Sequence, residues 1–304
     1  MSADLPPSID PRAAARWARL AHPVSPWLHE EIGRRMQERL QWIRLQPRNW
    51  VDWEPLSGGM QAHAAVAQAY PQAQCWVVEP DAARQGLAEQ ALRKPWWDAA
   101  RWRQTALQWG VPADGSADMV WANMALHMAA DPAALLRQWG RMLATDGFLM
   151  FSCLGPDTLV ELRSLYRARG WPAPAHEFTD MHDWGDMLVG AGFAEPVMDM
   201  ERVTLTFTSP ETLLAELRGL GRNLHRQRFA GLRARGWQAQ LQRELAQSQA
   251  AQKPGEPLVL TFEVIYGHAL KPSPRVAVQP ETVLSLDEMR QVLRQSQRDS
   301  PPKP

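Results

Sequence analysis

The sequence is poor in cysteine and in long apolar runs. Of its 304 residues, two are cysteines, Cys75 and Cys153, and both lie in apolar, strand-like stretches. Their separation fits neither a zinc site nor a redox pair, so we expect two reduced cysteines in the core of a cytoplasmic protein. No apolar run approaches the roughly 18 residues that a membrane span requires, and the N-terminus has no apolar signal region.

Net charge and the common catalytic motifs are also missing. Lysine plus arginine and aspartate plus glutamate number 33 each, which gives no electrostatic reason to expect nucleic acid or an anionic membrane as partner. The chain contains no GxGxxG, GxxxxGK[ST], HExxH or GxSxG motif, and without a P-loop we do not expect nucleotide hydrolysis. The histidines, among them His127, His182 and His268, lack metal-ligand spacing, so no metal site is predicted.

Tryptophan is abundant by contrast, with 15 residues. An aromatic side chain suits a protein core, and an aromatic-lined substrate groove is the alternative. The tryptophans expected to cap the core are Trp27, Trp42, Trp50, Trp76, Trp121 and Trp139.

The order of the expected elements indicates an α/β fold. Residues 11–46 predict two helices, the second with Ser25 as N-cap before Pro26. Strands are then expected at 49–53, 74–78, 117–123 and 148–154, and helices at 60–70, 82–92 and 133–143. This alternation predicts a mostly parallel sheet with helices on both faces.

The second half of the chain has a different pattern. Helices are expected at 156–169, 180–191, 209–220 and 222–250, and alternating strands at 197–207 and 258–270 predict an antiparallel edge of the sheet. Residues 272–304 are rich in proline and polar side chains, and we expect them to be largely disordered.

One crevice is expected where the strand order reverses, because ligands of open α/β sheets bind beyond the carboxyl ends of the strands. The loop after the first strand, the acid Glu79 after the second and the segment from Asn123 should meet there. A carboxylate at Glu79 could accept both hydroxyl protons of a ribose. The alternative is a solvated acid before a helix that starts at Pro80-Asp81.

Four stretches carry a resemblance to a known family. They are NMALHM (123–128), FSCLGPDTLVELR (151–163), FTDMHDWGDMLVGAGFAEPVMDMERVTLTF (178–207) and LTFEVIYGHAL (260–270). With the helical N-terminal stretches PRAAARW and LHEEIGRRMQERL, they resemble class I S-adenosylmethionine-dependent methyltransferases. More narrowly, they resemble the malonyl-acyl-carrier-protein O-methyltransferases of biotin synthesis.

The resemblance implies a fold and a reaction. The fold is a Rossmann-like, mostly parallel seven-stranded sheet with an antiparallel edge, formed by residues 47–271 behind a helical lid of residues 1–46. The reaction is transfer of a methyl group from S-adenosylmethionine to the free carboxylate of a malonyl thioester on an acyl carrier protein. An arginine should orient that carboxylate, and Arg202 and Arg222 are the candidates. The candidates for cofactor binding are Asp52, Glu54, Gly58, Gly59, Glu79, Gln108 and Asn123.

The stretch VDWEPLSGGMQ departs from the family pattern. A glycine-rich turn is expected after the first strand, but Glu54 and Leu56 stand in two glycine positions and Gly58 remains. Backbone must approach the cofactor closely there, which glycine permits. Three hypotheses follow: a divergent methyltransferase with a rebuilt loop, a protein that has lost cofactor binding and acts as a carrier-protein binder or partner subunit, and an NAD-type dehydrogenase. A second departure follows the third strand of the family pattern, where many methyltransferases have an aspartate that bonds the adenine. Here the stretch TALQWGVP offers Gln108, which could bond an adenine, and Trp109, which could stack on it.

Overall fold

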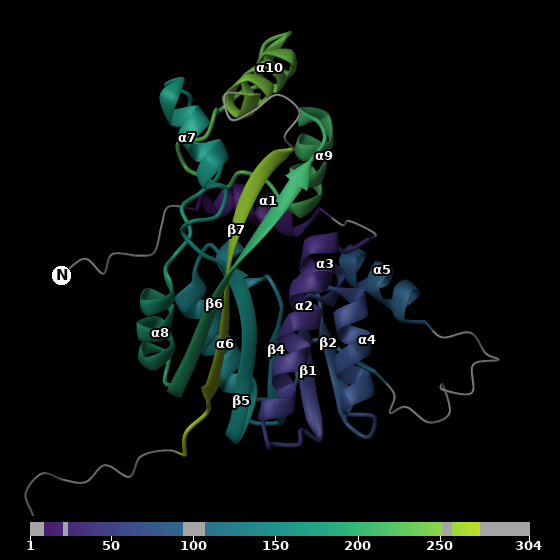
Figure 1. Cartoon of the computed structure of the whole chain (residues 1–304). Helices are drawn as coiled ribbons and strands as arrows, with labels where there is room; N and C mark the ends of the chain where they lie inside the picture. The colour runs from purple at the N-terminus through teal and green to yellow at the C-terminus, as the bar shows by residue number, and fades with distance from the viewer. Residues whose placement is uncertain (1–8, 21–23, 94–106, 251–256, 274–304) are drawn as a thin grey trace, which may run out of the picture. The chain divides into compact units, whose positions relative to one another are not determined.

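The computed structural model describes residues 9–20, 24–93, 107–250 and 257–273 (Figure 1). All of them except Ser273 belong to one compact unit, residues 1–272. The tail expected at 272–304 therefore lies almost wholly outside the described residues. Among these residues, no helix combines the length and the apolar composition that a bilayer span needs.

A seven-stranded sheet with the order β3-β2-β1-β4-β5-β7-β6 forms the centre. Strands β1 to β5 are parallel, β7 is antiparallel to β5, and β6 is antiparallel to β7. This confirms the mostly parallel sheet with an antiparallel edge. The strands are β1 (Asn49–Trp53), β2 (Gln74–Val78), β3 (Gln108–Trp109), β4 (Ala117–Ala122), β5 (Leu143–Leu154), β6 (Ala194–Phe207) and β7 (Leu258–Leu270).

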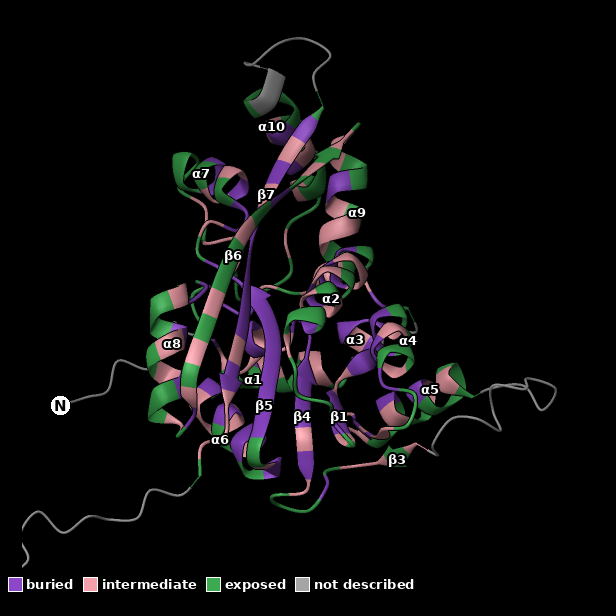
Figure 2. Ribbon diagram, turned by 60° about the horizontal axis from the view of Figure 1, so that its bottom comes forward, coloured by how far each residue is buried: buried purple, intermediate pink, exposed green. Residues whose placement is uncertain are grey.

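Helices cover both faces, because the central strands are apolar on both sides. On one face α2 (Trp27–Arg39) and α4 (Met60–Ala69) pack on Trp50, Trp121 and Phe148. On the other face α6 (Pro132–Met142) and α8 (Met181–Gly190) pack on Val120 and Phe151. Figure 2 shows β4 and β5 buried along most of their lengths, whereas the edge strand β6 is largely accessible.

Strands β6 and β7 continue past the end of β5. Leu154, the last residue of β5, pairs with Val264, so Leu258–Glu263 of β7 pair with β6 alone and form a two-stranded ribbon (Figure 1). Three helices pack beside this ribbon, and they contribute apolar side chains to the core that includes Leu260 and Phe262. They are α7 (Val160–Ala168), α9 (Pro210–Leu220) and α10 (Trp237–Ala250).

The remaining helices lie near the carboxyl ends of the parallel strands or beside the sheet. They are α1 (Pro11–Ala18), the one-turn α3 (Pro55–Gly58), α5 (Ala82–Leu92) and the short 3-10 segments Leu40–Trp42 and Leu126–Met128. Cys75 and Cys153 are buried and unpaired, as expected.

Several local expectations were wrong. Ser25 does not cap α2; its hydroxyl accepts the Met60 N–H at 3.1 Å and so caps α4, because the two helix starts lie side by side. Trp27 and Trp42 are 59% and 80% exposed: Trp27 is the first residue of α2, and Trp42 ends the 3-10 segment Leu40–Trp42 that follows it. Of residues 222–250, expected to be helical, 222–236 contain no helix and 237–250 form one.

Candidate functional site

The turn after β1 is a closed helical turn rather than an open glycine loop. Glu54 begins it with φ 56°, a left-handed conformation that glycine adopts without strain and glutamate rarely adopts. The Glu54 carbonyl then accepts the Gly58 N–H at 2.8 Å, and the Leu56 side chain is 1% exposed. Glu54 thus adopts a backbone conformation that is typical of glycine, and its side chain adds a carboxylate at the crevice.

The carboxylate of Glu79, the acid after β2, is buried in an ion pair with Arg84 of α5. One oxygen of Glu79 accepts the Leu56 N–H at 2.8 Å, and the other accepts Nε–H of Arg84 at 2.9 Å. Neither side chain is more than 3% exposed. Burial raises the pKa of Glu79 to about 7, and the ion pair with Arg84 opposes that rise. Glu79 therefore presents no free oxygen to a ligand in the crevice.

Arg84 also reaches the loop after β1. Its guanidinium donates to the Ser57 hydroxyl at 2.6 Å and lies 3.4 Å from the Glu54 carboxylate. A quarter of the Glu54 side chain is exposed. Burial raises the pKa of Glu54, with Arg84 acting in the opposite direction. Of the two acids beside Arg84, Glu54 is the one that faces the crevice.

The amino end of α4 is occupied by a side chain of α2. Glu30 accepts the N–H groups of Met60, Gln61 and Ala62 at 2.8, 3.0 and 3.1 Å. Gly59 permits this approach, since a Cβ there would lie 2.8 Å from a Glu30 oxygen. A dinucleotide would need the same N–H groups for its pyrophosphate, so this arrangement disfavours the dehydrogenase hypothesis.

Two further predicted residues hold the crevice in shape. Asp52 accepts a hydrogen bond at 2.7 Å from Nδ1 of His63, and both side chains are buried. Asn123 donates to the carbonyls of His29 (2.8 Å) and Gly58, and accepts the Ser152 hydroxyl at 2.5 Å. A Cβ at Gly58 would lie 2.9 Å from the Asn123 carbonyl. Gly58 therefore allows the turn to pack against β4.

A cavity of about 330 Å³ lies at the carboxyl ends of β1 and β4, and we call it the inner cavity. The loop after β1 contributes Glu54 and Ser57, and the segment after β4 contributes Asn123 and Ala125. The helix α1 covers it with Ala14 and small neighbours. The expected crevice is thus present, closed on one side by the N-terminal helix.

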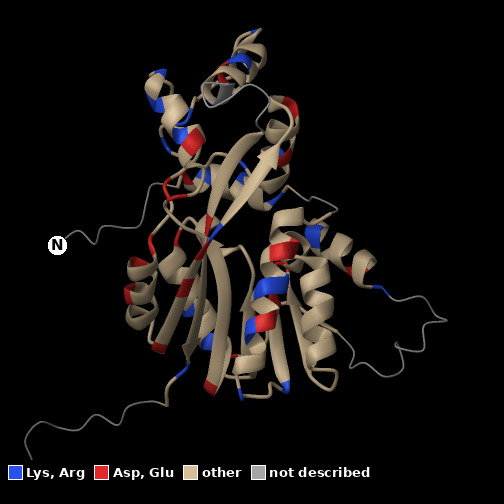
Figure 3. Cartoon of the chain, viewed as in Figure 1, with Lys and Arg blue, Asp and Glu red and all other residues tan. Residues whose placement is uncertain are grey.

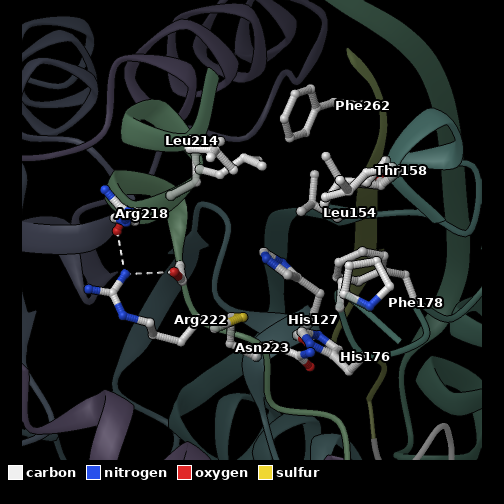
Figure 4. Close-up of a pocket in the computed structure, with 18 of the residues that line it drawn as sticks. His127, Leu154, Thr158, His176, Phe178, Leu214, Arg218, Arg222, Asn223 and Phe262 are labelled. Atoms are coloured by element: carbon white, nitrogen blue, oxygen red, sulfur yellow. Dashed lines mark hydrogen bonds between the residues drawn. The ribbon is translucent and has the colours of Figure 1, made fainter. Parts of the chain in front are cut away.

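A second cavity of about 310 Å³, the middle cavity, adjoins the inner one, because Met128 and Leu220 line both. Its walls are mainly apolar side chains of α7, α9, α10 and the ribbon. Figure 4 shows His127, His176 and Phe178 together on one side and Arg218 and Arg222 on the other.

The two imidazoles of the middle cavity are neutral near pH 7. Burial lowers the pKa of His176 to about 4 and that of His127 well below its ordinary value. His176 donates through Nε2 to the His127 carbonyl at 3.0 Å, and Nδ1 of each ring has no hydrogen-bond partner among the described residues. Buried polar atoms are normally paired, so these two unpaired nitrogens are an unusual feature of the cavity wall.

The other predicted residues lie at different distances from these cavities. Arg222 lines the middle cavity, where it donates to the Arg218 and Gly221 carbonyls and stacks on Trp17. Arg202 is exposed on β6 and pairs with Asp157. Gln108 is exposed on the edge strand β3 and does not line the inner cavity.

Sequence reasoning missed Arg84, Glu30 and His176. Arg84 and Glu30 look like surface residues of polar helix faces, and their partners come from other elements. His176 lies in an irregular stretch with no periodicity to mark it. A weak signal existed for Arg84 alone, since a helix start at Asp81 places it one turn after Glu79.

Comparison with known proteins identifies the chain. Residues 24–194 match the family model described as a methyltransferase domain. A malonyl-[acyl-carrier protein] O-methyltransferase of Gallionella capsiferriformans is 40% identical over 272 residues, 87% of this chain and 91% of that relative. One of Laribacter hongkongensis is 38% identical, covering 87% and 88%. The chain belongs to the malonyl-[acyl-carrier protein] O-methyltransferase family.

Solved structures agree on the fold. A Bacillus halodurans protein solved as a methyltransferase candidate has 15% identity, a TM-score of 0.53, and coverage of 78% of this chain and 99% of its own. The YcgJ protein of Bacillus subtilis has 15% identity, a TM-score of 0.52, and coverage of 81% and 99%. At this identity the likeness concerns the Rossmann-like fold alone.

The inner cavity fits S-adenosylmethionine if Glu54, in place of Glu79, provides the carboxylate for the cofactor. The cofactor needs a carboxylate for its ribose or its ammonium, and an apolar wall for its adenine. Glu79 is closed by Arg84, but Glu54 faces the same cavity. Trp53, Ala125 and Leu135 supply apolar wall. The loop after β1 thus places the acid Glu54 at the cavity, whereas the acid Glu79 is covered by Arg84.

Proposed function

We propose that the protein transfers a methyl group from S-adenosylmethionine to the free carboxylate of a malonyl group, borne as a thioester on an acyl carrier protein. The observation that carries this proposal is the pair of adjoining cavities with a shared wall at Met128 and Leu220. One cavity lies at the nucleotide position of the fold, and the other is apolar with arginines at its side. Family membership supports the same reaction.

In the inner cavity, Glu54 would accept hydrogen bonds from the cofactor, with Arg84 fixing its position. Asn123, Gly58 and Gly59 would act on the cofactor indirectly, by holding the turn and β4 together, and Asp52 would do so through His63. The bound cofactor supplies an activated methyl group. This role of Glu54 would explain why the family's glycine pattern is altered without loss of the cavity.

In the middle cavity, Arg222 would attract the malonyl carboxylate, and the neutral imidazole of His127 would donate a hydrogen bond to one of its oxygens or to the thioester carbonyl. A carboxylate is already a nucleophile, so no general base is needed and positioning with partial removal of water supplies the rate gain. Arg202, paired with Asp157 on β6, would act at the outer surface if it contacts the substrate at all.

The test is methylation of a malonyl-loaded acyl carrier protein by the purified protein with S-adenosylmethionine, followed by intact-mass spectrometry. The expected product is heavier by one methylene, and tandem mass spectrometry of the arm should place that mass on the malonyl group. Calorimetry with S-adenosylhomocysteine gives an independent readout. Absence of both binding and product would sink the proposal and leave the hypothesis of a non-catalytic carrier-protein binder.

The location proposed for this activity is the cytoplasm. The two buried, unpaired cysteines support a reducing compartment, where disulfides are rare. Fractionation of cells with an antibody to the protein would check this directly.

A further inference from the structure

A third hollow continues the path of the other two. It has a volume of about 250 Å³, and Pro174, Asn223 and Trp237 line both it and the middle cavity. We call it the outer groove. The shared residues make a continuous line of cavities, which leads from the inner cavity through the middle one to the surface beside α10.

The outer groove carries positive charge. Arg228 and Arg233 line it, and Arg233 is stacked between the rings of Phe229 and Trp237, 3.9 and 3.8 Å from their centres. Stacking fixes the guanidinium plane and leaves its N–H groups for a ligand. Arg228 is bound to Asp10 at 2.8 Å and is therefore held at the groove as well.

The chain around the outer groove is the most one-sided in charge. Residues 218–243, which we call the arginine segment, contain seven arginines and no acidic residue, in a protein whose formal net charge is zero (Figure 3). Arg226 and Arg235 are exposed, and Leu232 beside them is 98% exposed. Among the described residues, Arg228 is the member that pairs with a carboxylate. Exposed cations around an apolar side chain favour an acidic protein as partner.

Resting on the proposed function, we propose that the outer groove admits the phosphate-linked arm of an acidic carrier protein. Arg233 and Arg228 bind the phosphate of the arm, and the exposed part of the arginine segment contacts the carrier itself. The thioester end of the arm then lies in the middle cavity, beside His127 and His176. The three adjoining hollows would give such an arm a path from the surface to the inner cavity.

The first experiment compares two substrates. A malonyl thioester on the carrier protein has the arm and its phosphate, whereas a malonyl thioester of N-acetylcysteamine has neither. Arg233→Ala is expected to raise KM for the carrier-borne substrate at least tenfold and to change kcat/KM for the short thioester less than threefold. Arg233→Lys keeps the charge but loses the stacked plane, so an intermediate KM is expected. Equal losses on both substrates would overturn the phosphate-binding role.

The second experiment measures docking without methyl transfer. Binding of a carrier protein with an unloaded arm is followed by fluorescence anisotropy. The Arg226→Glu, Arg235→Glu double variant is expected to weaken binding at least tenfold at low salt, with the matched control Arg137→Glu, Arg141→Glu on α6 unchanged. Equal binding by the two double variants would overturn the carrier-docking surface.

Two further comparisons distinguish the proposed reaction from the proposed docking surface. Removing the arm from the carrier should weaken binding by a larger factor in the wild type than in Arg233→Ala. If malonyl-coenzyme A is used as well as the carrier-borne substrate and the charge reversals have no effect, the groove serves a free thioester and the docking proposal is wrong. If carrier binds as expected but nothing is methylated, the proposed reaction fails while the docking surface stands.

Discussion

Arg84 determines which carboxylate is available to a ligand of the inner cavity. It lies between two acids, bonded to Glu79 at 2.9 Å and 3.4 Å from Glu54. An arginine buried to 2% exposure requires such partners, because an unpaired buried charge is very costly. The guanidinium pairs with the buried Glu79 and leaves part of Glu54 accessible. The replacement of a glycine by Glu54 in the turn therefore accompanies the burial of Glu79.

Glu54→Gln should weaken binding of S-adenosylhomocysteine about tenfold, since a hydrogen bond to a charged group contributes about 1.5 kcal/mol or more. Glu79→Gln should leave that affinity within about threefold but lower the free energy of unfolding by about 3 kcal/mol, because it breaks a buried ion pair. Calorimetry and urea denaturation of both variants measure the two effects. The reverse pattern, with binding lost only in Glu79→Gln, would assign the acceptor role to Glu79.

At the scale of elements, the packing of α2 on α4 sets the position of the turn between them and β1. The two helices meet at Gly33, where a Cβ would lie 2.4 Å from the Ala62 Cβ and 2.9 Å from the Asn123 amide nitrogen. His29 of α2 donates to the Ser57 carbonyl at 2.8 Å. Helix α2 therefore packs directly against the turn that lines the inner cavity.

Gly33→Ala should destabilise the protein by about 1–3 kcal/mol, the usual cost of inserting a group into a packed interface. Gly86→Ala in α5 is the matched control, because a Cβ there meets nothing within 4 Å and alanine stabilises an exposed helix by about 0.5–1 kcal/mol. Urea denaturation of both variants is the measurement. Equal effects of the two substitutions would show that α2 does not pack on α4 at Gly33.

Most elements could be predicted from the sequence, and the connections between them could not. The strands at 74–78 and 258–270 have the predicted limits, because their apolar runs end at clear turn residues. Residues 222–250 were expected to be helical, because arginine and glutamine favour helices. Only 237–250 are helical, and 222–236 are held by contacts such as the Asp10–Arg228 pair. The crevice residues Glu54 and Asn123 were predictable from strand order, whereas the partners of Glu79 depend on the folded chain.

At the scale of the whole described unit, the burial of titratable side chains makes the free energy of unfolding depend on pH. Burial lowers the pKa of His29 and His176 to about 4, and it also lowers that of His127 well below its ordinary value. Since an unfolded histidine titrates near 6.5, the stabilising contribution of each is complete above that pH and is lost as the pH falls toward 4. Glu79, with its raised pKa of about 7, has the opposite sign: its contribution is complete below about 4.5 and is lost as the pH rises through 7.

His29→Gln isolates one of these contributions. The wild type should exceed the variant in free energy of unfolding at pH 7, and the excess should shrink by about 2–3 kcal/mol at pH 4.5, because only the wild type takes up this proton on unfolding. Denaturation at both pH values, with two buffers at each, measures the difference. An excess that stays constant would mean that His29 is accessible to protons in the folded protein.

The anchoring of α1 restricts how the protein can be shortened or tagged for laboratory use. Ile9 pairs with His225, the Asp10 N–H donates to the Leu224 carbonyl at 2.8 Å, and Ala14 lines the inner cavity. A recombinant version that begins at Ser25 would lack one wall of that cavity and would uncover Leu224, now 1% exposed. Tags and fluorescent labels therefore belong before residue 9, and a shortened protein that fails to bind cofactor would say nothing about the full chain.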